Sequence, residues 1–515
     1  MALAAFRCDA SARLGSGHVR RCLTLADALA DVGWSCRFLT ASSSLEVVPA
    51  LKSGRHEVVT LENPEADRPV DLDKFADPCA LFVVDHYGRG RDFDQSWRDL
   101  SERILVIDDL ADREHDADIL VDQTLGRTPA DYETLVPSHC RLLLGPIHAL
   151  LRPEFSASRW IALERRASMP SRRLFISVGG TDPLRITQRV LAGLENTRLD
   201  GADIVVGPSD PDADRLEHKA NRTGADIVVH VDPDDVSPLM VRADLAIGAV
   251  GVSAWERCCL GLPSLLIVAA ANQTENADRL VEWGAAELLR DLGPECIEAA
   301  VCRLLDDSAR LHAMSLAAAC ICDGVGTPRV ALALSPEKAR VGDVRLRPAT
   351  LADGHKIWEW EVIPGIRRFA RNPRVPAWPE HLAWLKRRLG DADSLLNIVL
   401  LDEIPAGVLR LDRQAGGAFE ASILVDPAVQ GKGIAQAALR AARRLLPSVP
   451  FQAEVHQDNA ASRRLFSRCG YQEESGQGPM TMWRNNPSEQ KSAHPSHSID
   501  GARTFRRRSD TTRAL

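Results

Sequence analysis

A histidine close to the amino terminus follows two glycines and precedes a helical pattern. In the stretch DASARLGSGHVRRC, residues 9–22, Gly15 and Gly17 permit a tight turn, and His18 falls in the first turn of the helix predicted over 19–30. The helix dipole opposes a positive charge there, so we expect a neutral imidazole that can accept a proton. A polar residue that only begins a helix has the same spacing, and the spacing does not decide between the two.

Polar groups and glycines follow three more predicted strands in the first two thirds of the chain. Gly180 ends the first of these strands, where bare main chain can approach a phosphate. Ser253 and Glu256 follow the second and have the spacing of a capping box, which fits a plain helix start as well as contact with a ribose. Asn272 and Gln273 follow the third, at the position where a parallel sheet presents groups to a ligand.

A second glycine-rich turn lies in the last third of the chain. The sequence ILVDPAVQGKGIAQAALRAARRLL contains a strand, a proline break, the turn Gln430-Gly431-Lys432-Gly433 and a long helix. Successive main-chain N–H groups at a helix amino terminus suit a pyrophosphate, although such a turn on its own is often only a loop. Two carboxylates on strands near this helix are candidates for a base, and both are equally compatible with solvated strand residues: Glu420 and Glu454.

The order of apolar runs predicts three folded parts. Runs such as ALFVVD and RILVID alternate with helical segments in the first part, and a second set from RLFISVGG to PSLLIV repeats the pattern, as in parallel sheets covered on both faces. Strands and helices mix less regularly after a polar linker, as in an α+β fold. The predicted boundaries are 1–155 and 156–333 for two Rossmann-like domains, 334–343 for the linker, 344–484 for the third domain and 485–515 for a disordered tail.

Size and composition indicate a soluble globular protein of two or three domains. The 515 residues exceed what one core accommodates, and the net charge of −8 argues against nucleic acid as the main partner. No apolar run is long enough to span a bilayer, and the first residues lack the pattern of a signal peptide, so we expect a cytoplasmic protein without membrane contact. The twelve cysteines show no zinc-binding spacing, and no metal is expected.

The first 330 residues resemble a known hydrolase family. RCDASARLGSGHVRRCLTLA, VVDHYG, IDDLADREHDADILVDQ, SVGGTDP, GVSAWERCCLGLPSL and DGVGTPRV occur in the order of the UDP-sugar hydrolases of pseudaminic acid biosynthesis (PseG), and the match covers about residues 6–332. That family cleaves UDP-2,4-diacetamido-2,4,6-trideoxy-β-L-altropyranose. The resemblance implies an α/β fold of two Rossmann-like domains in a glycosyltransferase-B-type arrangement similar to MurG.

The resemblance also implies roles for individual residues. His18 matches the family's catalytic histidine, which helps water attack the anomeric carbon with inversion and loss of UDP and without a metal. Asp9 shapes its loop, and Tyr87 of the DHY motif lies nearby. His148 stands where the family favours an aromatic residue, a departure that concerns the fit of the sugar. The residues implied to bind the UDP-sugar are Arg13, Gly15, Gly17, Gly180, Gly251, Ser253, Glu256, Asn272 and Gln273, with Glu256 toward the ribose.

The third part resembles the GNAT acetyltransferases. The glycine-rich turn and the later stretch FQAEVHQDNAASRRLFSRCGY match the family's acetyl-CoA signature over about residues 344–484. Acetyl-CoA is then a co-substrate, and the implied binding residues are Val425, Gln430, Gly431, Lys432, Gly433, Ile434, Ala435 and Asn459. Many members carry a tyrosine acid where this chain has Phe466, so the general acid is open. The segments WEW and HLAWLKRRL are similar to the sugar-nucleotide N-acetyltransferase of the same pathway (PseH), although tryptophans at helical spacing are more often part of a core.

Together the two resemblances imply a bifunctional enzyme. An acetyltransferase domain would acetylate the 4-amino group of a UDP-linked amino sugar, and the hydrolase domains would then release UDP from the product. Two alternatives remain: a glycosyltransferase with an attached acyltransferase, and a hydrolase whose third domain binds acetyl-CoA without catalysis.

Overall fold

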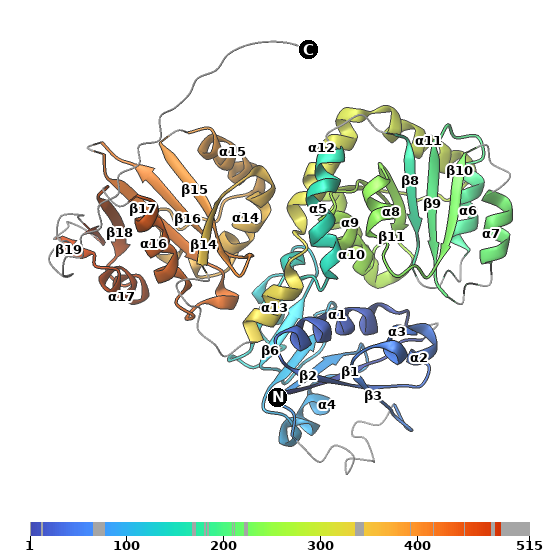
Figure 1. Cartoon of the computed structure of the whole chain (residues 1–515), viewed down its shortest axis with the longest axis horizontal. Coiled ribbons are helices and arrows are strands. Elements are labelled where there is room, and N and C mark those ends of the chain that lie inside the picture. The colour runs from blue at the N-terminus through green and yellow to red at the C-terminus, as the bar shows by residue number, and fades with distance from the viewer. Residues whose placement is uncertain are drawn as a thin grey trace, which may run out of the picture.

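The computed structural model contains three β-sheets, each with its own helices (Figure 1). It describes residues 2–11, 14–64, 78–166, 171–179, 182, 185–208, 210, 212–220, 225–334, 344–391, 393–415, 417–446, 449–474 and 479–485. The expected linker after residue 334 and the expected tail after residue 485 lie outside the described residues.

The first sheet has seven parallel strands in the order β3-β2-β1-β4-β5-β6-β7. Its inner strands are buried apolar runs, as expected for a parallel sheet covered on both faces. Its elements are β1 (Leu3–Cys8), α1 (Gly17–Asp31), β2 (Ser35–Thr40), α2 (Ser44–Val47), α3 (Ala50–Ser53), β3 (Glu57–Thr60), β4 (Leu81–Asp85), α4 (Arg91–Ser96), β5 (Ile104–Ile107), β6 (Ile119–Asp122), β7 (Arg141–Leu144) and the 3₁₀ turn η4 (Pro146–His148).

The second sheet has six parallel strands in the order β10-β9-β8-β11-β12-β13. Helix α5 (Pro153–Arg166) connects it to the first sheet. Its elements are β8 (Arg173–Ser177), α6 (Ile186–Gly193), β9 (Gly201–Val206), α7 (Ala213–Ala220), β10 (Asp226–Val231), α8 (Ser237–Arg242), β11 (Leu245–Ala249), α9 (Val252–Cys259), β12 (Ser264–Ile267), the 3₁₀ turn η5 (Ala271–Gln273), α10 (Thr274–Glu282), β13 (Ala286–Leu288), α11 (Pro294–Asp306), α12 (Ser308–Ile321) and α13 (Gly326–Leu334).

The third sheet is mostly antiparallel, in the order β14-β15-β16-β17-β18-β20-β19, with β17 and β18 parallel. Two Rossmann-like sheets followed by an α+β domain confirm the predicted fold class. The elements of the third domain are β14 (Val344–Pro348), α14 (Gly354–Val362), α15 (Trp378–Leu389), β15 (Ser394–Leu401), β16 (Ile404–Arg413), β17 (Phe419–Val425), the 3₁₀ turn η9 (Pro427–Val429), α16 (Ile434–Leu445), β18 (Phe451–His456), α17 (Ala460–Arg468), β19 (Gln472–Glu474) and β20 (Met480–Asn485).

Helix α13 ties the three domains together. Although it follows the second sheet in the chain, it packs against α1 of the first domain and against η9 of the third (Figure 1). Its apolar residues belong to the core of the first domain, and Val330 and Leu334 are fully buried there. The third domain is therefore docked on both preceding domains.

A buried group of charges fixes this docking. Arg329 of α13 is only 1% exposed, and its guanidinium donates to the main-chain oxygen of Ile147 and pairs with Asp323 at 3.0 Å. The Arg329 Nε atom lies 3.6 Å from a carboxylate oxygen of Asp426 in the third domain. Asp323 also pairs with the Lys356 ammonium of α14 at 2.5 Å. Burial raises the pKa of Asp323, but Arg329 and Lys356 outweigh it and hold that pKa well below the usual range.

Two other buried side chains border this group. Burial raises the pKa of Glu359 well above its usual range, and the charge of Asp323 raises it further. Burial likewise lowers the pKa of His148 to about 4, and its Nδ1 atom lies 2.8 Å from the Leu144 carbonyl oxygen. Since the charges acting on His148 are those of Asp426 and Arg329, this residue lies at the junction with the third domain.

An aromatic cluster forms a second contact between the domains. Trp283, directly after α10 of the second domain, packs against three rings of the third domain. Its ring centroid lies 4.5 Å from that of His355, 5.3 Å from that of Trp358 and 5.2 Å from that of Trp378. The neighbouring Trp360 is fully buried. These tryptophans therefore pack a core and a domain junction.

The raised pKa of Glu359 predicts a pH-dependent loss of stability. A carboxyl whose pKa is higher in the folded protein than in the unfolded chain stabilises fully below about pH 4, and this contribution is lost as the pH rises through the folded pKa. Glu359→Gln, which stays neutral, should therefore exceed the wild type in stability increasingly from pH 5 to pH 8, by up to about 1.4 kcal/mol per pH unit. Thermal unfolding followed by circular dichroism measures the difference.

The control is Glu361→Gln on the same helix. Glu361 pairs with Arg367 at 3.2 Å, so its loss should not stabilise the protein at high pH. A constant difference between Glu359→Gln and the wild type over this range would contradict the assignment of Glu359.

Candidate active sites

The predicted site residues of the first two domains lie where each parallel sheet reverses its strand order. These points fall between β1 and β4 and between β8 and β11, and ligands bind beyond the carboxyl ends of the strands at such points. The two edges meet: a β-carbon built on Gly17 would lie 3.9 Å from Cγ2 of Val252. The side-chain amide of Asn272 also donates to the Tyr87 hydroxyl at 3.2 Å.

His18 is held by a carboxylate at the end of β4. It occupies the first turn of α1, is 6% exposed, and its Nδ1 atom lies 2.6 Å from Oδ1 of Asp85. Asp85 is fully buried; burial raises its pKa, but the charges of Arg21 and His18 outweigh burial and keep it well below the usual range. An ionised Asp85 accepts the Nδ1–H of the imidazole, which leaves the Nε2 lone pair for a proton.

Arg21 completes this arrangement one helical turn after His18. Its guanidinium binds both oxygens of Asp85, at 2.5 and 2.6 Å, and its third nitrogen lies 3.1 Å from Asp109. A buried carboxylate needs such partners, because an unpaired buried charge is strongly unfavourable. Asp85 is therefore a fixed orienting group for the imidazole.

Tyr87 lies over the imidazole. The two rings meet edge to face, with centroids 4.5 Å apart. The Tyr87 hydroxyl donates to Asp109 at 3.4 Å while it accepts from Asn272. Burial raises the pKa of Tyr87 well above its usual range, and Asp109 raises it further, so the hydroxyl stays protonated and can donate a hydrogen bond.

The other predicted residues of the first domain shape the loop before α1. Asp9 accepts from the Ala41 main-chain N–H at 2.7 Å and pairs with Arg7 at 2.8 Å, so it anchors the end of β1. Gly15 has a φ of 78°, and its N–H closes a turn on the Ser11 carbonyl at 2.8 Å. Arg13 lies outside the described residues.

The predicted residues of the second domain lie at the facing edge. Gly251, not Ser253, is the N-cap of α9, and the Ser253 hydroxyl accepts from Arg257 at 3.1 Å, so the capping box does not form. Glu256 is half-buried, and burial raises its pKa. Gln273 accepts from the Ala269 main-chain N–H at 3.0 Å and so shapes its own loop. Gly180 lies outside the described residues.

The site therefore contains three residues that the sequence did not single out. These are the orienting carboxylate, the arginine that binds it and the acceptor of the tyrosine hydroxyl: Asp85, Arg21 and Asp109. Asp85 ends the predicted strand ALFVVD, and Arg21 follows His18 by three residues on one helix face. The position of Asp85 at a strand end and the helical spacing of Arg21 could therefore have indicated these two residues in advance.

The second site surrounds the glycine-rich turn of the third domain. Gly431 and Gly433 have φ values of 80° and 83°, which favour glycine, and α16 begins at Ile434. The Gln430 side chain donates to the carbonyl oxygen of Val425, the last residue of β17, at 3.1 Å. The turn therefore lies at the amino terminus of α16, where a phosphate is favoured.

Strands β17 and β18 separate beyond their first residues. Their parallel register covers only Phe419–Phe451 and Glu420–Gln452, although both strands continue. Glu420 and Glu454 lie on these strands, and both carboxylates contact the guanidinium of Arg371, that of Glu420 at 2.5 Å. The two base candidates thus share one cation in this structure.

The remaining predicted residues of the third domain have structural contacts. The side-chain oxygen of Asn459 accepts from the Ser462 main-chain N–H at 3.0 Å and so caps α17. Phe466 is 4% exposed and packs edge to face on Tyr471, with centroids 5.0 Å apart. A phenyl ring in the core supplies no acid at this position.

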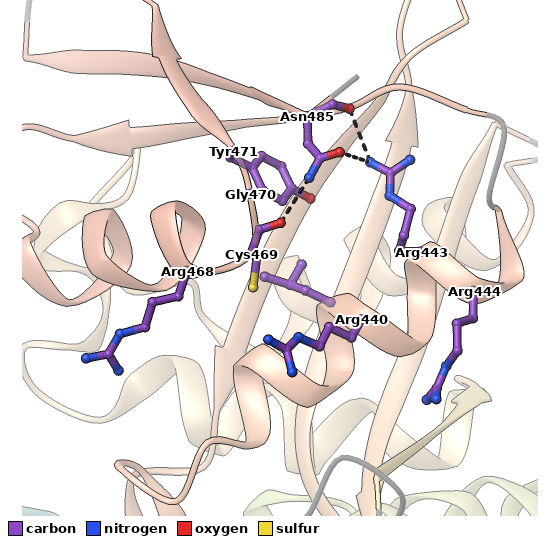
Figure 2. Close-up of a pocket in the computed structure, with 9 residues that line it drawn as sticks. Arg440, Arg443, Arg444, Arg468, Cys469, Gly470, Tyr471 and Asn485 are labelled. Carbon is purple, nitrogen blue, oxygen red and sulfur yellow. Dashed lines mark hydrogen bonds between the residues drawn. The ribbon is translucent and has the colours of Figure 1, made fainter. Parts of the chain in front are cut away.

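A pocket of about 470 Å³ lies at the carboxyl ends of α16 and α17 (Figure 2). Arg443 donates to the main-chain and side-chain oxygens of Asn485, and its guanidinium covers the ring of Phe451. These are contacts that hold β20 and the sheet in place. The pocket contains none of the predicted acetyl-CoA residues; its lining residues are Leu439, Arg440, Arg443, Arg444, Arg468, Cys469, Gly470, Tyr471 and Asn485.

Metal-binding clusters and membrane-spanning helices are both absent from the described residues. No group of three or more His, Cys, Asp or Glu side chains in this part of the chain is placed to hold a metal ion. None of its helices has the length and apolarity required to cross a membrane.

Comparisons with known proteins find relatives of different parts of the chain. A family model described as an acetyltransferase (GNAT) domain matches residues 343–472. The UDP-2,4-diacetamido-2,4,6-trideoxy-β-L-altropyranose hydrolase of Campylobacter jejuni is 27% identical over 281 residues, which are 54% of this chain and 96% of the hydrolase. An uncharacterized protein of Methanocaldococcus jannaschii is 22% identical over 480 residues, 90% of this chain and 95% of that protein.

Among solved structures, MurG of Acinetobacter baumannii is similar with a TM-score of 0.45 and 15% identity, over 64% of this chain and 98% of that one. The chain therefore joins a homologue of the UDP-sugar hydrolase, which contains the His18–Asp85 site, to a carboxy-terminal GNAT acetyltransferase domain.

Proposed function

We propose that the chain carries out two consecutive reactions on one nucleotide-linked amino sugar of pseudaminic acid biosynthesis. Residues 344–484 transfer acetyl from acetyl-CoA to the 4-amino group, and residues 1–333 hydrolyse the resulting UDP-2,4-diacetamido-2,4,6-trideoxy-β-L-altropyranose. The observation that carries the proposal is the His18–Asp85 pair, at a point where two parallel sheets face each other. We further propose that both reactions occur in the cytoplasm, without a metal.

The hydrolysis uses His18 as general base. A water molecule attacks the anomeric carbon from the face opposite UDP, and its proton passes to Nε2 of His18. The carbon–oxygen bond to UDP breaks, UDP leaves with the electron pair, and the configuration inverts. Asp85 keeps the Nδ1 proton in place and offsets the charge of the imidazolium that forms.

The second domain holds the nucleotide in this proposal. Glu256, at the start of α9, binds the ribose, while Gly251 and Ser253 flank the phosphates. Asn272 bridges to Tyr87, so nucleotide binding and the catalytic loop share one hydrogen bond. The Tyr87 hydroxyl stands beside the imidazole as a donor to the sugar or to the leaving oxygen.

The acetyl transfer depends mainly on positioning. The deprotonated 4-amino group attacks the thioester carbonyl, the carbon–sulfur bond breaks, and CoA leaves as the thiolate, which takes up the proton lost by the amine. The glycine-rich turn holds the phosphates of the donor, with Val425, Ile434 and Ala435 on either side of it and Asn459 at the start of α17. Before the attack, Glu420 or Glu454 removes one proton from the ammonium form of the 4-amino group; the second proton, lost as the amide forms, is the one that the thiolate takes up.

A glycosyltransferase with an attached acyltransferase is the competing function. Such an enzyme releases UDP only when an acceptor is present, whereas a hydrolase releases UDP and the reducing sugar in water alone. A third domain that binds acetyl-CoA without catalysis would release no CoA from acetyl-CoA and the amino sugar.

His18→Ala separates the two reactions. Given acetyl-CoA and the 4-amino UDP-sugar, the wild type should release CoA and UDP, and the variant should release CoA alone, because the loss of a general base reduces hydrolysis by about 10²- to 10⁴-fold. Coupled assays for the CoA thiol and for UDP follow both products, and calorimetry should show nearly unchanged UDP binding. Hydrolysis at the wild-type rate would refute the role of His18.

Asp85→Asn tests the orienting carboxylate. An asparagine amide would donate to Nδ1 and favour the tautomer that lacks a free Nε2 lone pair, so kcat for UDP release should fall by about 100-fold with KM little changed, and the pH dependence of kcat should shift. Steady-state kinetics over a pH range measure these changes.

Asp94→Asn is the matched control, because the fully buried Asp94 pairs with Nδ1 of His115 at 2.9 Å in the same domain, away from the site. If kcat for UDP release falls equally in both variants, the effect of Asp85→Asn comes from lost stability and not from a lost orientation of His18.

Separate substitutions of the two base candidates test the acetyl transfer. Glu420→Gln or Glu454→Gln, whichever removes the base, should lower kcat for CoA release by about 10²-fold and abolish the acidic limb of its pH profile. The other variant should retain both, because its carboxylate only shares Arg371. Unchanged kcat in both would assign the proton to water.

A further inference from the structure

The acetyl-CoA turn of the third domain is docked on the first domain. Ala428, two residues before Gln430, is 3% exposed and belongs to the apolar core that contains Val330 and Leu334 of α13. The guanidinium of Arg141 donates to the Pro427 carbonyl oxygen at 3.2 Å. The start of the turn is thereby fixed to the first sheet and to α13. Helix α13 lies beside the third domain in Figure 1.

Two arginines of the first domain approach this turn. Arg141 is the first residue of β7, and Arg103 directly precedes β5. Arg141 donates to the Ala333 carbonyl oxygen at 3.3 Å and Arg103 to that of Leu334 at 3.1 Å, so both lie at the carboxyl end of α13. Both are half-buried. Burial lowers the pKa of Arg141, and the charge of Asp426 only partly offsets this, so Asp426 is close enough to act on Arg141.

The positive charges of both arginines reach Lys432 in the turn. Burial lowers the pKa of Lys432, and the charges of Arg141 and then Arg103 lower it further. The nearest acidic group on the turn is Asp426, whose carboxylate already faces Arg329 at 3.6 Å. Arg141, which contacts Pro427 at the start of the turn, and Arg103 therefore add positive charge from the first domain to that of Lys432, at a helix amino terminus that favours an anion.

We propose that the phosphate groups of acetyl-CoA are bound jointly by the Gln430–Gly433 turn and by Arg103 and Arg141 of the hydrolase homologue. The proposal rests on the acetyl-transfer function proposed above and adds the part contributed by another domain. Arginine guanidinium groups suit phosphate oxygens because they offer several parallel N–H donors. The N–H donors of Arg103 and Arg141 that do not bind main-chain carbonyl oxygens are the ones proposed to bind the phosphates.

The alternative is that these arginines only stabilise α13. Cations at the carboxyl end of a helix interact favourably with its dipole and its last carbonyl oxygens. In this role the arginines contact only the chain itself, so their substitution lowers stability and leaves the affinity of the folded protein for CoA unchanged, whereas phosphate binding makes that affinity depend on their charge. Glutamine keeps side-chain donors without the charge, and lysine keeps the charge, so the two substitutions distinguish the roles.

The experiment measures CoA binding to the full-length protein by isothermal titration calorimetry. Arg103→Gln/Arg141→Gln should bind CoA at least about tenfold more weakly than the wild type, because it loses two charged partners of the phosphates. Its affinity should also depend less on salt. Arg103→Lys/Arg141→Lys should recover most of the affinity, and UDP binding should be equal in all three proteins.

Arg440→Gln is the control, since this exposed arginine lies on α16 beside the pocket of Figure 2, in the half of the helix away from the turn. It should bind CoA like the wild type, and thermal unfolding reports whether the variants are folded. Wild-type affinity in folded Arg103→Gln/Arg141→Gln overturns the joint site alone. Absence of CoA binding in the wild type instead overturns the proposed acetyl transfer.

Discussion

The arrangement of the whole chain depends on one buried guanidinium. Arg329 contacts carboxylates of two segments that are far apart in sequence, Asp323 before α13 and Asp426 before the glycine-rich turn Gln430–Gly433. Burial lowers its pKa, but those two carboxylates outweigh burial and raise it, so the group remains charged. A buried ion pair contributes little net stability against an apolar replacement, yet loss of one partner leaves an unpaired charge that costs about 3–5 kcal/mol. Its main effect is therefore to define one docking position for the third domain.

The same logic applies at the hydrolase site on a smaller scale. Asp85 is fully buried and would be unfavourable alone, and the guanidinium of Arg21 makes its ionised form stable. The carboxylate can then orient His18 without being protonated itself. Helix α10 links this site to the acetyltransferase, because Asn272 precedes it and Trp283 follows it.

The sequence predicted the local features well and the long-range partners poorly. The tight turns before His18 and at Gln430–Gly433 could be predicted from their glycines, because a turn depends on the residues within it. The ends of β1 and β4 could be predicted from the points where apolar runs stop. That Asp85 faces His18 depends on a parallel pairing across 67 residues, and that Arg141 reaches Pro427 depends on docking across 286 residues. Neither contact has a local signature in the sequence.

The docking also bears on whether the acetyltransferase is a separable unit. Without the first domain, Ala428 would lose the core in which it is buried, and Asp426 would lose Arg329, its buried partner. The segment that bears both residues leads directly into the glycine-rich turn, so these losses fall on the element that is proposed to hold acetyl-CoA. A loosened turn would lose preorganisation, which is the main contribution of a protein to a reaction that depends on positioning. In the proposed enzyme the first domain therefore has two effects on the acetyltransferase. It supports the turn that holds acetyl-CoA, and it keeps the hydrolase site close to the place where its substrate is made.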